Sequence, residues 1–331
     1  MAVLITGAGF IGCHTAKLLT ERGERVIMLD SSPEPKAIGT LVDSGRITLV
    51  RQDICDYEAL LGLIDLHGVK RIFHAAAVLS RALLRSPRLG IMVNVMGTAN
   101  VLEAARKRNL ERVVLASSTL AGLSVVENFK GDRFPEDFSM RVVSEHPRSL
   151  YAATKISAEH LCLYYRDAYG VDVAVVRYSA VIGHWPGAPR SLTGQILSAF
   201  LDPAMQGKRA IIDDPQLVWS GSQEYVDVRD AARGTVAALN APAVPSAVYN
   251  ISSGVKHTFD EFIGLVREVI PAIEVDIRVA PKGAAPTQAR PPLDLRLAEK
   301  ELGFKPLFQM RDTIRDYVSS QAWSKFIDAG H

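Results

Sequence analysis

The first half of the chain alternates short apolar runs with longer segments of helical pattern. The apolar runs, which predict strands, lie at 3–6, 25–30, 47–53, 71–77, 112–118 and 171–177. Helical patterns separate several of them, at about 10–22, 57–66, 90–109 and 149–169. Strands that are apolar along nearly their whole length are typical of a parallel sheet covered by helices on both faces. The pattern therefore predicts a doubly wound α/β domain.

Beyond residue 178, several prolines divide the chain into shorter pieces, which predict a second lobe. A helix at 226–239 and a strand at 248–251 are expected to return to the first lobe. Residues 258–331 add helices and a proline-rich loop at 281–292. We therefore expect two interleaved units: a nucleotide-binding domain of 1–178 with about 224–252, and a smaller α/β substrate-binding lobe of about 179–223 with 253–331.

The composition is that of a globular protein, with 331 residues, 48% hydrophobic and 22% charged. A net charge of +2 without a basic stripe makes nucleic acid an unexpected partner. The weakly polar stretch 113–126 is too short and too often interrupted to cross a membrane. The apolar start of the chain runs at once into glycines, so we expect a strand there and no signal peptide.

The three cysteines and eight histidines exclude two kinds of site. Cys13, Cys55 and Cys162 have neither metal-site nor disulfide-framework spacing, which favours a reducing cytoplasm. The histidines form no ligand cluster, so no metal is expected.

Three glycines follow the first predicted strand and open a helix. Gly7, Gly9 and Gly12 form a GxGxxG pattern, with Phe10 and Ile11 inside it. Glycine allows a tight turn and a close approach to a pyrophosphate, whose charge is stabilised by N–H groups at the helix N-terminus. This context predicts a dinucleotide site.

Acidic residues end the next two strands. Asp30, at the end of the second strand, can accept hydrogen bonds from the adenosine ribose and would repel a 2′-phosphate, which favours NAD over NADP. Lys36 is close enough to keep NADP open. Asp53 follows the third strand and could contact adenine or cap a helix, with Ile54 beside it as a further candidate contact.

Tyr151 and Lys155 lie four residues apart in a predicted helix, which places both side chains on one face. A free tyrosine has a pKa of about 10, and a base working near pH 7 needs roughly 3 units less. A lysine charge beside the phenol would lower that pKa. The pair therefore predicts a base that removes a hydroxyl proton during hydride transfer.

These motifs, in this order, resemble the extended short-chain dehydrogenase/reductase family, the NAD-dependent epimerase/dehydratase group, from residue 3 to residue 308. The likeness also covers 74–77, 94–100, 225–231 and 294–306, although the glycine loop at 6–12 is one residue shorter than the usual fingerprint. The resemblance implies a Rossmann-like sheet and NAD as cofactor, with Ala75 and Ala76 among its contacts. It also implies a homodimer formed through the helices at 90–109 and 149–169.

The resemblance implies roles for the catalytic candidates. Ser118 would hold the substrate oxygen, with Ser117 and Thr119 as alternatives for that position. Tyr151 would remove the hydroxyl proton, while Lys155 would tune Tyr151 and bind the nicotinamide ribose. The tyrosine that usually follows the family's serine is replaced by Gly122 in this chain.

The resemblance also narrows the reaction. Dehydratases of the family carry a carboxylate pair directly after the catalytic hydroxyl residue, whereas 119–121 reads Thr-Leu-Ala here. A 4,6-dehydratase is therefore disfavoured, which leaves 4-epimerase-like or dehydrogenase chemistry at a secondary alcohol or ketone carbon. A dehydrogenase releasing NADH from a sugar acid or polyol, and a non-catalytic NAD sensor, stay open as alternatives.

The substrate side departs from the family's nucleotide-sugar epimerases. Ala180 and Gln223 stand where those enzymes carry an asparagine and an arginine for the diphosphate, and Glu224 adds a negative charge. Fewer charge-assisted pairs predict weaker diphosphate binding, which favours a smaller sugar, sugar acid or polyol over a nucleotide sugar. The candidate substrate contacts are Thr119, Arg81, Ser179 and Arg290, although Arg81 also fits a solvated basic helix face.

Overall fold

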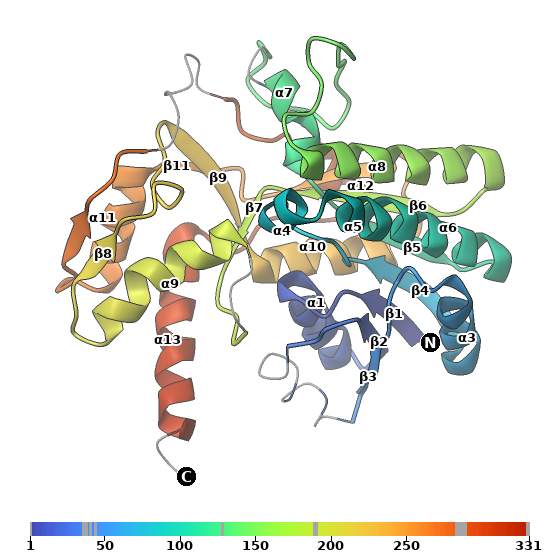
Figure 1. Ribbon diagram of the computed structural model, residues 1–331, viewed down its shortest axis with the longest axis horizontal. Coiled ribbons are helices and arrows are strands. Elements are labelled where there is room, and N and C mark those ends of the chain that lie inside the picture. The colour runs from blue at the N-terminus through green and yellow to red at the C-terminus, as the bar shows by residue number, and fades with distance from the viewer. Residues whose placement is uncertain are drawn as a thin grey trace.

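A seven-stranded parallel sheet forms the centre of the protein (Figure 1). The computed structural model describes residues 2–34, 39, 42, 45–126, 129–187, 191–281 and 290–328, with side chains up to residue 320. The strand order is β10 (Val248–Ile251), β6 (Val173–Tyr178), β5 (Arg112–Ser118), β4 (Val69–His74), β1 (Ala2–Thr6), β2 (Arg25–Asp30) and β3 (Ile47–Arg51). All neighbours in this sheet pair in parallel, so the predicted doubly wound fold is confirmed.

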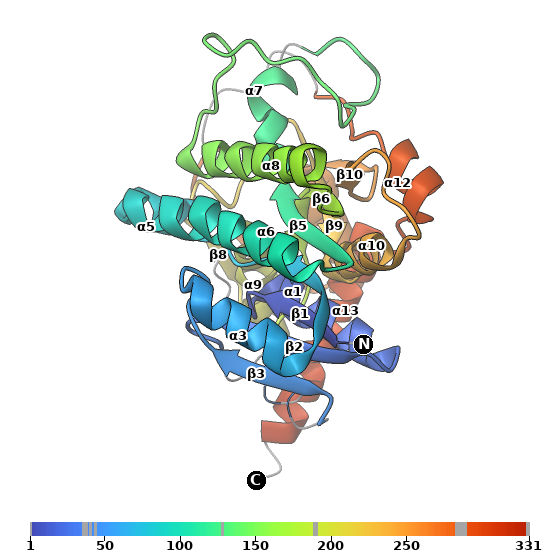
Figure 2. The ribbon, with the colours of Figure 1, turned by 90° about the vertical axis from the view of Figure 1, so that its right-hand side faces the viewer.

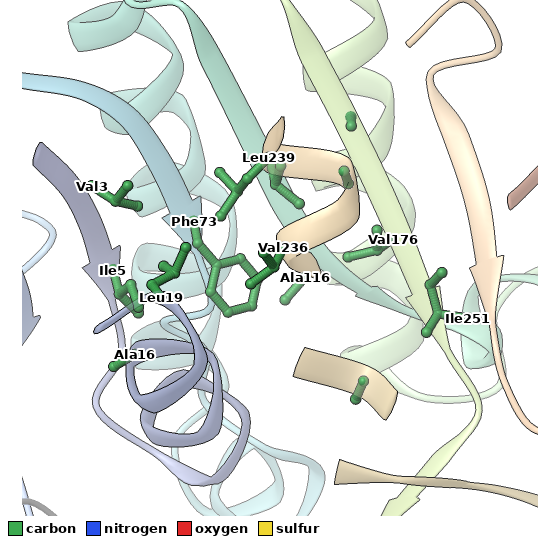
Figure 3. Close-up of a cluster of buried hydrophobic side chains, with 14 of the residues drawn as sticks. Val3, Ile5, Ala16, Leu19, Phe73, Ala116, Val176, Val236, Leu239 and Ile251 are labelled. Carbon is green, nitrogen blue, oxygen red and sulfur yellow. The ribbon is translucent and has the colours of Figure 1, made fainter. Parts of the chain in front are cut away.

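Helices cover both faces of this sheet (Figure 2). One face packs against α3 (Tyr57–His67), α6 (Gly97–Arg108) and α8 (Leu150–Tyr169). The other packs against α1 (Phe10–Glu21), α10 (Val228–Asn240) and α12 (Arg296–Leu302). Because side chains alternate along a strand, the apolar residues 2–5 of β1 supply both cores. Figure 3 shows part of the second core, where Leu19, Phe73 and Val236 lie together.

Residues close to the C-terminus complete this second core. Ala298 of α12 is 0% exposed and Phe304, just beyond the helix, is 2% exposed, in the same cluster as Val3 and Leu19. Gly303 ends α12 in the left-handed conformation, which lets the chain turn back onto the sheet. The central sheet is therefore buried partly by residues from the last tenth or so of the sequence.

A smaller group of strands and helices surrounds a separate core that contains Phe200, Phe262 and Ile314. Its strands are β7 (Ala180–Ile182), β9 (Ser222–Asp227) and β11 (Lys256–Thr258) in one sheet, and β8 (Ala210–Ile212) and β12 (Val275–Ile277) in another. Its helices are α9 (Leu192–Met205), α11 (Phe259–Val269) and α13 (Met310–Asp328) (Figure 1).

Several predicted boundaries differ from the structure. The helix predicted at 226–239 begins at Val228, because residues up to Asp227 belong to β9 and the Asp227 carboxylate caps the helix through the Arg229 N–H. The predicted helix at 90–109 consists of α5 (Pro87–Ile91), the π-helix η1 (Met92–Met96) and α6. The shorter elements α4 (Ser80–Arg85), η2 (Thr119–Gly122) and α7 (Leu123–Val126) were not predicted. Lys36 and most of the predicted loop at 281–292 lie outside the described residues.

The sequence predicts neither a membrane-spanning helix nor a metal site, and each expectation can be compared with the described residues alone. Among them, no helix combines the length and the apolar character needed to cross a membrane. No cluster of histidine, cysteine and acidic side chains suited to a metal ion is found in the same part of the chain.

Candidate functional site

The glycine loop connects β1 to α1 and is shaped by contacts that only glycine allows. Gly7 has a φ of +92°, and a Cβ there would lie 2.7 Å from the Ala76 backbone nitrogen. A Cβ at Gly12 would lie 2.0 Å from the Gly7 carbonyl oxygen. Next to Gly9, by contrast, there is open space within 4 Å. The fold therefore requires Gly7 and Gly12, whereas Gly9 leaves room for a phosphate to approach the backbone.

This loop lies where the strand order reverses between β1 and β4, the usual place of a ligand in such sheets. The Ala75 N–H donates to the Thr6 carbonyl over 2.8 Å, which holds the two strand ends together. Phe10 and Ile11 are half-buried in the first turn of α1, which carries no acidic residue. The N-terminal N–H groups of α1 can therefore stabilise a pyrophosphate.

Asp30 lies directly beside the glycine loop. Its Oδ2 accepts the Ala8 N–H at 2.8 Å and its Oδ1 accepts the Ser32 N–H at 2.7 Å. A carboxylate oxygen has a second lone pair, so both bonds leave capacity for ribose hydroxyls. The same residue can thus fix the loop and bind the adenosine ribose.

Asp53 and Ile54 occupy the turn after β3. The Asp53 Oδ1 accepts the Cys55 N–H at 2.9 Å, while α3 is capped by Asp56. The reading of Asp53 as a helix cap is therefore wrong. Ile54 is 4% exposed and packs against Gly97, where a Cβ would lie 3.0 Å from its Cγ2. Contact of either residue with the cofactor stays a prediction.

His74 joins three elements behind the cofactor loop. Its Nε2 lies 3.0 Å from the Thr98 hydroxyl, which itself donates to the Asn94 carbonyl, so Nε2 carries the proton. Its Nδ1 then accepts from the Thr6 hydroxyl at 2.6 Å. Burial lowers the pKa of His74 to about 3, which keeps the ring neutral. The ring therefore ties β1, β4 and α6 together beside Ala75.

The three catalytic candidates lie at the carboxyl end of the sheet. Ser118 is the last residue of β5, and its Oγ accepts the Leu120 N–H at 3.2 Å to begin η2. Thr119 is the first residue of η2. Tyr151 and Lys155 lie in the first two turns of α8, which packs against β5 and η2. The predicted serine, tyrosine and lysine are thus brought to adjoining elements.

The charges around Tyr151 differ from the prediction. The Lys155 ammonium is 5.6 Å from the centre of the Tyr151 ring and donates to the Ala116 carbonyl at 2.7 Å. Burial lowers the pKa of Lys155 to about 8, opposed by the Glu159 charge, and burial raises the pKa of Tyr151 to about 12. In the protein alone the net shift of the Tyr151 pKa is therefore upward, opposite to the predicted lowering, because burial dominates. A further positive charge in the site would favour the deprotonated phenol that a base near neutral pH needs.

A buried ion pair behind Lys155 was not foreseen from the sequence. Glu159 and Arg177 are 3% and 8% exposed, with the Arg177 Nη2 2.6 Å from the Glu159 Oε2 and the Ser117 hydroxyl donating to Glu159. Arg177 also donates to the Glu136 carbonyl at 2.6 Å. The position of Glu159 four residues after Lys155 was the available signal, since it places both on one helix face.

Replacing Glu159 by glutamine should destabilise the protein and change its pH dependence. Arg177 keeps its charge but loses its buried partner, which costs about 3–5 kcal/mol of unfolding free energy. The negative charge that opposes the lowering of the Lys155 pKa is also removed, so the ammonium deprotonates at a lower pH. Urea unfolding should show the first effect, and the alkaline limb of the pH–rate profile should move to lower pH.

The matched control is Glu24→Gln, which breaks the largely buried Glu24–Arg71 pair near the amino-terminal end of β4. It should lower stability and leave the alkaline limb in place. If the alkaline limb of the pH–rate profile also stays in place in Glu159→Gln, the Glu159 charge does not influence the Lys155 pKa.

The predicted substrate contacts have different surroundings. Arg81 lies on α4 and pairs with Asp214, its Nη2 3.1 Å from the Asp214 Oδ2, so it links the two parts of the protein. Ser179 is buried and accepts the Ser252 hydroxyl at 2.6 Å. Arg290 is half-buried, and its carbonyl oxygen accepts the Lys256 ammonium.

Glu224, which was predicted to oppose a diphosphate, is engaged in hydrogen bonds within the protein. Its Oε1 accepts the Gly254 N–H at 3.1 Å and its Oε2 accepts the Leu293 N–H at 2.9 Å, so it holds two loops together. Burial raises its pKa, an effect that the nearby Lys256 charge opposes. Lys256, which sequence reasoning missed, therefore adds a second cation beside Arg290.

Gly122, which replaces the tyrosine that usually follows the family's serine, is explained by its neighbours in the structure. A Cβ at Gly122 would lie 2.8 Å from the Phe134 ring and 3.0 Å from the Phe138 ring. Phe134 is held by its N–H, which donates to the Pro292 carbonyl at 2.8 Å. The segment before α8 thus fills the space beside Gly122.

Comparison with known proteins identifies the family. Residues 3–252 match the NAD dependent epimerase/dehydratase family, and the chain belongs to it. It is 26% identical to a UDP-glucuronate 4-epimerase from Thermodesulfobacterium geofontis, over 97% of this chain and 95% of that protein. The fold matches a Thermus thermophilus UDP-glucose 4-epimerase in complex with NAD, with a TM-score of 0.75, 26% identity and coverage of 96% and 98%.

A similar match is an L-threonine dehydrogenase from Cupriavidus necator in its holo form, with a TM-score of 0.78, 25% identity and coverage of 97% and 100%. Together these findings confirm the extended short-chain dehydrogenase/reductase class. The protein is an NAD-dependent epimerase or dehydrogenase that exchanges hydride at a secondary alcohol or ketone carbon, and its cofactor is NAD. The two alternatives, a dehydrogenase of a sugar acid or polyol that releases NADH and a non-catalytic NAD sensor, are not favoured.

Proposed function

We propose that the protein is a 4-epimerase of a UDP-linked sugar that keeps its NAD throughout the reaction. The observation that carries this proposal is that Ser118, Tyr151 and Lys155 lie on adjoining elements, β5 and α8, and that β5 belongs to the same parallel sheet that carries the glycine loop. The names of its relatives support UDP-glucose or UDP-glucuronate as the substrate class. The absence of a carboxylate at 119–121 favours epimerisation over elimination.

In the proposed reaction bound NAD would supply a reversible hydride acceptor at the sugar C4, so that hydride leaves one face of that carbon and is returned to the opposite face. Ser118 holds the C4 oxygen. Tyr151 takes the hydroxyl proton as the C–H bond breaks, and gives it back when the ketone is reduced. Lys155 binds the nicotinamide ribose and favours the tyrosinate by its charge. Atoms and electrons balance within one cycle, so no net NADH forms.

The cofactor and substrate contacts are proposed from the same geometry. For NAD they are Gly7, Gly9, Phe10, Ile11, Gly12, Asp30, Asp53, Ile54, Ala75, Ala76, Tyr151 and Lys155. For the sugar and its diphosphate they are Thr119, Arg81, Ser179 and Arg290. We add Lys256, because two half-buried cations close together suit a diphosphate.

The test is to quantify the NAD released on denaturing the purified protein, and then to incubate the protein with UDP-glucose or UDP-glucuronate. We expect near-stoichiometric NAD, and a C4 epimer detected by NMR without added cofactor. Reversible NAD binding with accumulation of NADH would instead assign a dehydrogenase. Bound NAD without turnover of any sugar nucleotide would contradict the epimerase proposal.

We also propose a homodimer that buries an exposed apolar surface. Leu89, Met92 and Met96 of α5 and η1 are 52%, 39% and 46% exposed, and Tyr164 on α8 is 60% exposed. A cluster of exposed apolar side chains of this kind is typical of an interface. The double variant L89E/M96E should elute as a monomer in size-exclusion chromatography with light scattering. The control Ile211→Glu, 47% exposed in the wild type, should stay dimeric; a wild-type monomer would contradict the proposal.

The domain division and the cellular location are proposals too. The central sheet with its helices forms the NAD-binding domain, and the strands around Phe200 and Phe262 form the substrate lobe. Unpaired cysteines at 13, 55 and 162 support a reducing cytoplasm. Fractionation of the native cell would test the location.

A further inference from the structure

The segment after β7 makes contacts on both sides of the proposed cofactor position. We call residues 183–187 the strap. At its beginning, Gly183 has a φ of +153°, and a Cβ there would lie 2.7 Å from Val228 and 3.6 Å from the Phe10 ring. The strap therefore starts in close contact with the first turns of α10 and α1.

The middle of the strap is bound to α1. The Trp185 and Phe10 rings lie 6.1 Å apart between their centres, and Phe10 sits directly after Gly9. The His14 Nε2 lies 3.0 Å from the His184 carbonyl oxygen. Since the acceptor is a carbonyl, the ring nitrogen donates, and burial lowers the pKa of His14 to about 4, which keeps the ring neutral.

The other contacts anchor the strap to the loop after β2 and to the second lobe. A Cβ at Gly187 would lie 2.8 Å from the Glu34 Cγ, and Glu34 is four residues beyond Asp30. The His184 ring packs edge-on against Tyr317 of α13, with 5.8 Å between the centres. His184 is thus half-buried and fixed.

We propose that the strap retains NAD in the site between successive turnovers. The strap extends from Phe10, near the proposed pyrophosphate position, to Glu34. Between these two contacts lies Asp30, whose carboxylate would bind the ribose. A dinucleotide held between Gly9 and Asp30 can leave only when these contacts separate. Retention suits an epimerase, because the hydride must return to the same substrate. The inference rests on the proposed cofactor site.

The first test is the exchange of bound radiolabelled NAD against unlabelled NAD. Trp185→Ala should raise the dissociation rate at least about tenfold, since affinity changes of this kind fall mainly on the off-rate. Trp185→Phe should have a smaller effect. The control is Trp219→Phe, which changes a tryptophan of the second lobe that packs against Phe259 and Phe262, and should leave the rate within about twofold. An unchanged rate in folded Trp185→Ala would overturn the proposal.

A second test does not depend on removing a large side chain. The double variant E34C/G187C joins two positions that lie close together, since a Cβ at Gly187 would lie 2.8 Å from the Glu34 Cγ, and a disulfide needs Cβ atoms roughly 3.5–4.5 Å apart. After loading with NAD, oxidation should slow exchange strongly, and reduction should restore it. Equal exchange rates in both states would sink the retention role. A wild-type protein that binds no NAD would instead contradict the proposed function itself.

Discussion

Replacing Tyr151 by phenylalanine is expected to lower kcat by about a thousandfold while NAD affinity stays near that of the wild type. The substitution removes the only proposed proton acceptor for the sugar hydroxyl and keeps the aromatic ring in place. Because burial raises the pKa of this tyrosine to about 12, the phenol is protonated at neutral pH until the site gains positive charge. The rate of C4-epimer formation, followed by NMR, and a fluorescence titration with NAD measure the two quantities.

The control for this variant is Tyr164→Phe, on the same helix but 60% exposed, which should turn over like the wild type. If Tyr151→Phe keeps more than a tenth of the activity, another group moves the proton.

Gly12→Ala should abolish NAD binding and weaken the fold. The new methyl group would lie 2.0 Å from the Gly7 carbonyl oxygen, so the backbone of the loop must move. Overpacking of this kind costs about 1–3 kcal/mol or more. Displacement of the loop also moves the N–H groups that face the pyrophosphate. Thermal unfolding and isothermal titration with NAD check the two effects.

Gly9→Ala separates binding from folding in the same loop. Its methyl group meets no atom within 4 Å, so the free energy of unfolding should stay within about 1 kcal/mol of the wild type. NAD affinity should nevertheless fall, because the methyl group enters the space that a phosphate needs. Wild-type NAD affinity in Gly12→Ala would contradict the placement of the cofactor at this loop.

The central sheet was predictable because its signals are local. The limits of β2, β5 and β10 coincide with the strands predicted at 25–30, 112–118 and 248–251 from their mainly apolar sequences. β9 was missed because Gln223 and Glu224 interrupt its apolar pattern and because it pairs with β11, about thirty residues later in the chain. The π-helix η1 was missed for a related reason, since its extra residue per turn has no signature in the periodicity.

In the candidate site, too, features with a local sequence signal were predicted and features set by distant segments were not. The spacing of Tyr151 and Lys155, and the position of Asp30 after its strand, were sufficient to predict where these residues lie. The Glu159–Arg177 pair depends on the register of β5 and β6, in which Ser117 lies opposite Arg177. The Trp185–Phe10 contact joins residues far apart in the chain. Contacts set by tertiary packing cannot be read from spacing in one sequence.

The burial of Ala298 and Phe304 under the first sheet has a consequence for biosynthesis. A ribosome delivers every strand of that sheet by residue 251, yet the cover of one face is completed only about fifty residues later. Until then the emerging chain exposes apolar surface beside α1 and α10. During this interval the nascent protein stays unaggregated only if aggregation is slower than synthesis or if chaperones bind the exposed surface. A fragment ending near residue 252 would expose this apolar surface permanently.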